Sequence, residues 1–200
     1  PDVLAANFKK AGDIMAFVSQ ETKANLHDVA TSFQAATGIA EQYGVSIEFA
    51  AGVMTSLGKQ GIVASKAGTF TRNFIEEMYQ PKSGKAEKAL KDLGVSAYNK
   101  DGSARKELEV TLELVKKLEK YNASSKDSFV ADIFGERGAK AFRAISADLP
   151  GFIKSMEEAA ASTGLLDKQT EKLAKSTQYQ LNQLSAEFSN LLTKVWNDES

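Results

Sequence analysis

The sequence predicts an all-α protein, a bundle of about seven to nine helices. Apolar residues recur at steps of three and four along most of the chain, which is the spacing of one helix face. Glycine, proline and serine interrupt these stretches where helix ends and caps are expected. A chain of 200 residues with 42% hydrophobic content is long enough to bury a core. A single strand-like signal interrupts the helical pattern, near residues 95–102.

The apolar periodicity places the helices in order along the chain. The expected stretches cover residues 3–18, 25–43, 47–57, 66–79, 84–93, 105–121 and 125–134, a continuation over 141–145, a helix from Pro150, and a last one over 167–196.

Small polar residues and glycines fix the expected helix ends. Gly44 fits a left-handed residue that ends one helix, and Ser46 fits the N-cap of the next. Ser83 or Gly84 begins the short helix that Gly94 ends.

The second half of the chain has similar signals. An N-cap at Ser124 or Ser125 is expected, followed by a break between Gly135 and Gly138. Pro150 fits the first turn of a helix. Residues 95–102 contain an Asp-Gly turn after a short alternating run, which predicts a small hairpin-like excursion.

The last segment has its apolar residues at alternating four- and three-residue steps. These residues are Leu173, Leu181, Leu184, Phe188, Leu191 and Val195. The spacing fits a coiled-coil seam through which copies associate into a homo-oligomer. It fits equally well a long amphipathic helix packed on its own domain, and the pattern leaves both open.

We expect two parts, a helical core domain over residues 1–164 and a long C-terminal helix over residues 165–200. The chain begins with proline rather than methionine, and we expect it to be a fragment of a longer chain. No stretch has the roughly 18 uncharged apolar residues of a membrane span. The net charge of −1 gives no support for nucleic-acid recognition.

Few residues suggest catalysis or a metal or cofactor site. The absence of cysteine excludes disulfides and thiolate chemistry. The single histidine, His27, is followed by Asp28, but neighbours on a helix do not face each other as a triad requires. The pairs Glu76-Glu77 and Glu157-Glu158 could act in general acid–base catalysis in principle. Positions on solvent-exposed helix faces account for them better. We therefore expect no enzyme and no cofactor.

The stretch GKQGIVASKAGT, residues 58–69, is rich in small residues. A phosphate-binding loop has a different glycine spacing and follows a strand, and the apolar residues inside this stretch argue against a flexible linker. We interpret it as a tight corner between consecutive helices, in which small residues allow close approach. Ser65 is expected to cap the second helix, and Gly61 and Gly68 to provide clearance. The full set of corner residues is Gly58, Gly61, Ser65, Ala67 and Gly68.

This corner is one of an ordered series of short motifs. They are YGVSIE at 43–48, the run at 57–69, Gln-Pro at 80–81, LGV at 93–95, KDG at 100–102 and FGERGA at 134–139. No single motif is specific, but their order resembles the core region of phage tail tape-measure proteins over about residues 25–164.

The resemblance implies a structural virion protein without catalytic residues. Such a segment lies in the lumen of the tail tube, helps to set tube length and assembly, and leaves ahead of the DNA; it is found in the host cytoplasm during assembly. The implied partners are the tail-tube protein, tail-tip or baseplate proteins, tail-assembly chaperones and other tape-measure copies. Two alternatives stay open: a non-phage adaptor domain that uses residues 95–102 for recognition, and a lytic enzyme built on a carboxylate pair.

Overall fold

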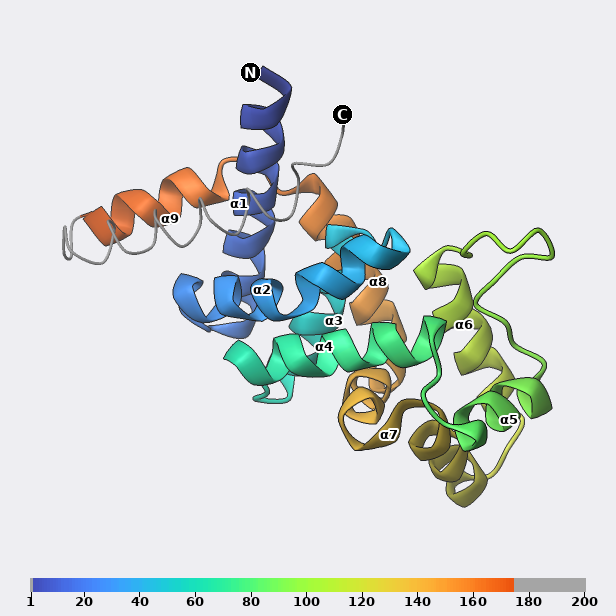
Figure 1. Ribbon diagram of the computed structural model, residues 1–200. Coiled ribbons are helices and arrows are strands. Elements are labelled where there is room, and N and C mark those ends of the chain that lie inside the picture. The colour runs from blue at the N-terminus through green and yellow to red at the C-terminus, as the bar shows by residue number, and fades with distance from the viewer. Residues whose placement is uncertain (1, 175–200) are drawn as a thin grey trace.

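The computed structural model describes residues 2–174, and within them the chain forms nine helices (Figure 1). The predicted all-α bundle is therefore confirmed. The helices are α1 (Asp2–Thr22), α2 (Leu26–Tyr43), α3 (Ile47–Lys59), α4 (Ala64–Tyr79), α5 (Gly84–Leu93), α6 (Glu107–Leu118), α7 (Ala123–Ala147), α8 (Leu149–Ala161) and α9 (Leu165–Ala174). In Figure 1, α1 and α9 meet at one end of the molecule, and α5 and α6 lie at the other.

Several helix ends lie where the sequence predicts them. The side chains of Asn25, Ser46 and Ser83 accept hydrogen bonds from the first-turn amides of α2, α3 and α5. Gly44 and Gly94 end α2 and α5 in the left-handed conformation, with φ of 63° and 65°. Glycine suits these positions because it adopts positive φ without steric strain.

α6 and α7 begin at other residues than expected. α6 is shorter than the predicted 105–121, because the Arg105 amide donates to the Ala97 carbonyl, 2.8 Å away, before the helix begins. α7 is capped by Asn122, whose side chain accepts from the Ser125 amide, so the predicted serine cap is wrong. The expected break appears as one kink at Gly135, with φ of 60° and ψ of −173°.

α3 lies at the centre and packs against α1, α2, α4, α7 and α8. Every residue from Phe49 to Leu57 is buried. Phe49 and Val53 join a large apolar cluster with residues of α4–α8, whereas Ala50 and Met54 join a smaller cluster with α1 and α2. A helix that is covered on all sides must be apolar or small all round, as this stretch is.

Phenylalanine rings join four helices in the larger cluster. The Phe74 ring lies 5.0 Å from that of Phe134, which lies 5.1 Å from Phe142, between ring centroids. Phe49 meets Phe152 edge-on at 5.6 Å. These separations fall in the favourable range for aromatic pairs, so the rings tie α3, α4, α7 and α8 together.

The predicted hairpin-like excursion is present between α5 and α6. Tyr98 and Ala104 form an isolated antiparallel bridge, and the Asn99 amide donates to the Ser103 carbonyl at 2.9 Å. Gly102 turns the chain with φ of 86°. This loop projects at the right of Figure 1, at the end opposite α9.

Candidate functional site

The predicted corner lies between α3 and α4, but Ser65 does not cap α4. The N-cap is Val63, which makes no side-chain cap hydrogen bond, and Ser65 is exposed within the first turn. The first helical residue, Ala64, has φ of 54°, and its carbonyl accepts a hydrogen bond from the hydroxyl of Ser32 on α2. The predicted cap at Ser65 is wrong because α4 begins one residue earlier, at Ala64, so that Ser65 lies inside the helix.

Gly68 of the corner faces α2 rather than α3. A methyl group at Gly68 would lie 2.7 Å from Cα and 2.8 Å from C of Ser32, and closer still to the Ser32 carbonyl oxygen. Ala67 beside it is 2% exposed. α4 therefore crosses α2 with the two backbones in contact. Gly68 makes room for α2, and not for α3, the helix that precedes α4 in the sequence.

The other two corner glycines have different roles. Gly61 has φ of 78° and open space around its α-carbon. Glycine is therefore needed here to adopt the left-handed conformation of the turn, and not to make room for a neighbouring helix. A methyl group at Gly58 would collide with the side chain of Thr22, where α1 ends against α3.

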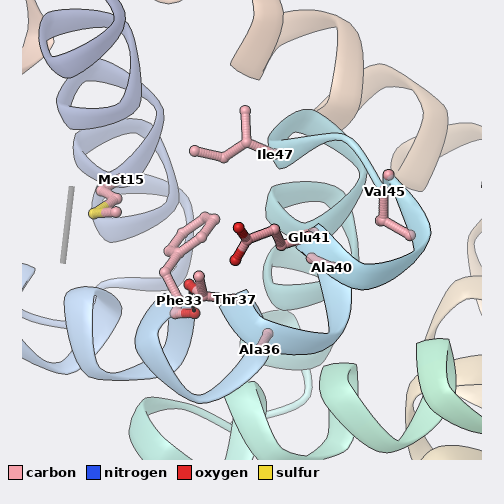
Figure 2. A pocket seen from close by; sticks show the side chains of 10 residues that line it. Met15, Phe33, Ala36, Thr37, Ala40, Glu41, Val45 and Ile47 are labelled. Atoms are coloured by element: carbon pink, nitrogen blue, oxygen red, sulfur yellow. Dashed lines mark hydrogen bonds between the residues drawn. The ribbon is translucent and has the colours of Figure 1, made fainter. Parts of the chain in front are cut away.

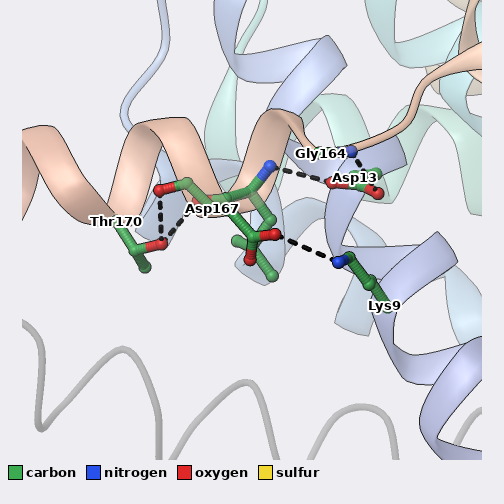
Figure 3. Close-up of polar contacts among 6 residues, drawn as sticks. Lys9, Asp13, Gly164, Asp167 and Thr170 are labelled. Atoms are coloured by element: carbon green, nitrogen blue, oxygen red, sulfur yellow. Dashed lines mark hydrogen bonds and ion pairs between the residues drawn. The ribbon is translucent and has the colours of Figure 1, made fainter.

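A polar joint connects α1 to α9 (Figure 3). The Asp13 carboxylate on α1 accepts hydrogen bonds from the amides of Gly164 and Leu166, each at 2.9 Å. Asp13 is only 2% exposed. These amides belong to the N-terminal turn of α9, which lacks intrahelical acceptors and favours negative charge. Asp13 thus caps a helix that lies 151 residues away in the sequence.

One turn earlier, Lys9 forms an ion pair with Asp167 at 3.1 Å, at the surface of the joint. The hydrogen bond from Lys9 to Asp167 and their Coulomb attraction raise the pKa of the lysine amino group. Both side chains are more than half exposed, and pairs of this kind contribute little to stability. The buried Asp13 contacts are the stronger part of the joint. Asp13 is not among the residues predicted from the sequence, although a lone aspartate inside an apolar run is a detectable signal.

An apolar groove opens between α1, α2 and α3 (Figure 2). Met15 and Phe33 lie at its base, Ile47 lies on its wall, and the exposed carboxylate of Glu41 lies at its mouth. The cavity volume is about 150 Å³. This is below the usual 300–1,000 Å³ of small-molecule sites and comparable to one large apolar side chain.

A second cavity of about 360 Å³ lies between α6 and α7. Val115 and Phe142 line its apolar part. Arg143 and Asp127, joined at 2.7 Å, lie at its margin. Both charged side chains are largely exposed, so this cavity shows no buried polar group directed at a ligand.

One glutamate of each pair considered for acid–base chemistry, Glu76 and Glu158, forms an ion pair with a lysine. Glu76 pairs with Lys82 at 2.9 Å, and Glu158 pairs with Lys154 at 3.5 Å along one helix face. The two pairs lie on different helices, α4 and α8. His27 is an exposed residue in the first turn of α2. Among residues 2–174, no cluster of histidine, aspartate and glutamate could hold a metal ion.

Tyrosines connect the excursion to the bundle. Tyr79 stacks on Tyr43 with ring centroids 4.8 Å apart and meets Tyr98 edge-on at 6.1 Å. Burial raises the pKa of the Tyr79 phenol, whose hydroxyl donates to the Arg105 carbonyl at 2.7 Å. At the tip, hydrogen bonds from Ser103 lower the pKa of the exposed Asp101. The excursion is thus anchored to α4 rather than free.

These features define a class: a helical packing domain whose polar groups mostly cap helices and join them to one another. Within residues 2–174, each helix is either too short or too polar to span a bilayer. Comparison with known proteins gives the family. Residues 3–135 match the model for phage-related minor tail proteins, and the chain belongs to this family.

The chain is also similar to a probable tape measure protein of Escherichia phage P2, with 30% identity over 161 residues. That alignment covers 80% of this chain but 18% of the relative, so the chain spans about a fifth of the relative's length. No solved structure matches.

Family membership shows that the chain is a structural component of a phage tail, and hence of the virion. The non-phage adaptor interpretation is thereby excluded. The described part of the last helix includes Leu173, whereas the seam residues from Leu181 onward lie outside the described residues.

Proposed function

We propose that the chain is a folded segment of a tail tape-measure protein. It lies in the tail-tube lumen, helps to set tube length and assembly, and leaves before the DNA is ejected; during assembly it is in the host cytoplasm. The observation that carries the proposal is the similarity to the probable tape measure protein over 161 residues. The all-helical packing of residues 2–174 is consistent with it.

The fold determines how much such a segment contributes to the length of the tail. An unbroken α-helix rises about 1.5 Å per residue, so residues 2–174 would span about 260 Å if extended. A compact domain of this size has a radius of gyration of about 16 Å. The helices pack around α3 rather than in a line, and the folded segment would therefore add only a few tens of ångströms.

An in-frame deletion of residues 2–174 in the phage genome tests the proposal, with tail length measured by electron microscopy. We expect tails shortened by a few tens of ångströms, or failed tail assembly. Synonymous recoding of the same codons is the control. Normal tail length together with full infectivity would contradict a role in length or assembly.

The proposed partners are the tail-tube protein, tail-tip or baseplate proteins, tail-assembly chaperones and other copies of the tape-measure chain. Self-association would use the C-terminal seam that the sequence predicts over residues 173–195. Molar mass in solution, measured with and without residues 167–200, tests this part. A monomer in both cases contradicts self-association of this chain.

We also propose that the segment has no hydrolytic role, because Glu76 and Glu158 are each held in an ion pair with a lysine and the two glutamate pairs lie on different helices. Separate Glu76→Gln and Glu157→Gln variants should leave a peptidoglycan-cleavage assay at the same baseline as the wild type. Cleavage by the wild type that either variant abolishes would overturn this view.

A further inference from the structure

α9 is attached to the described chain through α1. No other described helix shares more than marginal contact with α9. Its first two residues, Leu165 and Leu166, are only partly buried, against the smaller apolar cluster. None of the α9 side chains that the structure describes belongs to the larger cluster that joins α3–α8. The described apolar side chains of α9 therefore bury less surface than those of the other helices.

The polar contribution is concentrated in one carboxylate. Both oxygens of Asp13 accept amides of the α9 N-terminal turn, and hydrogen bonds to a charged acceptor are stronger than neutral ones. A buried carboxylate without partners is strongly unfavourable. In the described structure these two amides are the hydrogen-bond partners of Asp13. The Asp13 carboxylate on α1 and the N-terminal amides of α9 therefore satisfy each other's hydrogen-bonding groups.

The connection before α9 permits movement. α8 ends at Ala161, and the next residues lead through an exposed Thr163 to Gly164, which has φ of 68°. Glycine is tolerant of other backbone conformations at this position. A change there redirects α9 without altering α8.

We propose that Asp13 is a latch that holds α9 against α1, and that α9 releases as a unit while α1–α8 stay folded. Release changes the direction in which the chain continues after Gly164. It also uncovers the part of the smaller apolar cluster against which Leu165 and Leu166 pack. The latch follows from the contacts of α1 and α9 and does not depend on the proposed function.

Hydrogen exchange measured by mass spectrometry on the full chain tests the latch. In the wild type, amides of residues 164–174 should exchange by local opening, faster than those of α3 and α4. In Asp13→Asn, one oxygen can still accept while the amide nitrogen faces the second donor, so protection of residues 164–174 should fall about 10- to 100-fold. Asp13→Ala should reduce it further.

Asp148 offers a matched control. It caps α8 locally, accepting the Gly151 amide at 3.0 Å. Asp148→Asn should leave the difference in protection between residues 164–174 and α3 unchanged.

Two outcomes overturn the proposal. If residues 164–174 stay as protected in both Asp13 variants as in the wild type, Asp13 does not hold α9. If the wild type exchanges residues 164–174 only together with α3 and α4, or an Asp13 variant loses protection uniformly along the chain, α9 is part of one cooperative unit and does not release separately.

Discussion

Gly68 and Gly52 each lie where two helices cross, but the atoms that they face differ. At Gly68, α4 meets the backbone of Ser32 on α2. At Gly52, α3 meets the side chains of Met156 and Phe152 on α8, where an added methyl group would lie 2.6 Å from Met156 Cγ and 2.9 Å from the Phe152 ring. Backbone atoms in a helix cannot move without displacing the whole element, whereas side chains can change rotamer. The two crossings should therefore differ in their tolerance of added volume.

The largest effect is expected at the backbone crossing. Gly68→Ala should lower the free energy of unfolding by about 3 kcal/mol, because overpacking here forces α2 and α4 apart. Urea unfolding measures it as a shift in midpoint. A midpoint within error of the wild type would show that α2 and α4 are not in backbone contact at Gly68.

A smaller loss is expected at the side-chain crossing. Gly52→Ala should lower the free energy of unfolding by about 1 kcal/mol, since overpacking against Met156 is partly offset by the better helix propensity of alanine. The same urea titration serves as the measurement. If Gly52→Ala is as harmful as Gly68→Ala, the contrast between backbone and side-chain neighbours is wrong.

The smallest change is expected at a glycine outside any crossing. Gly38 lies in the middle of α2, is exposed, and has no atom within 4 Å of an added methyl group. Gly38→Ala should therefore raise the free energy of unfolding by about 0.5–1 kcal/mol. A loss of stability in this variant would mean that this face of α2 is covered.

The features predicted correctly from sequence are those whose cause is local. The predicted cap Ser46 and the predicted helix start at Ser83 each act on an amide three residues later, and Gly44 ends its own helix. The excursion near residues 95–102 follows from its Asp-Gly turn. Such interactions appear in sequence as fixed short spacings, so reading along the chain finds them.

The errors and omissions concern contacts between distant residues. Ser65 has the right chemistry for a cap, but α4 begins at Ala64, and the Ser32 hydroxyl of α2 donates to the Ala64 carbonyl there. Asp13 was overlooked because its partners, Gly164 and Leu166, follow 151 and 153 residues later. Gly68 was recognised as a point of close approach, but the helix that approaches it could not be inferred without the fold. The division at residue 164 into a core domain and a C-terminal helix stays a prediction.

The placement of α3 between the two apolar clusters has a consequence for how the domain unfolds. Each cluster uses a different face of the same 13-residue helix. Neither cluster can lose α3 without exposing the other to water, so disruption on the α1–α2 side is transmitted to the phenylalanine rings on the α7–α8 side. α3 thus adds to the α2–α4 crossing at Gly68 as a second link between the two clusters, and a single sharp transition is expected for both.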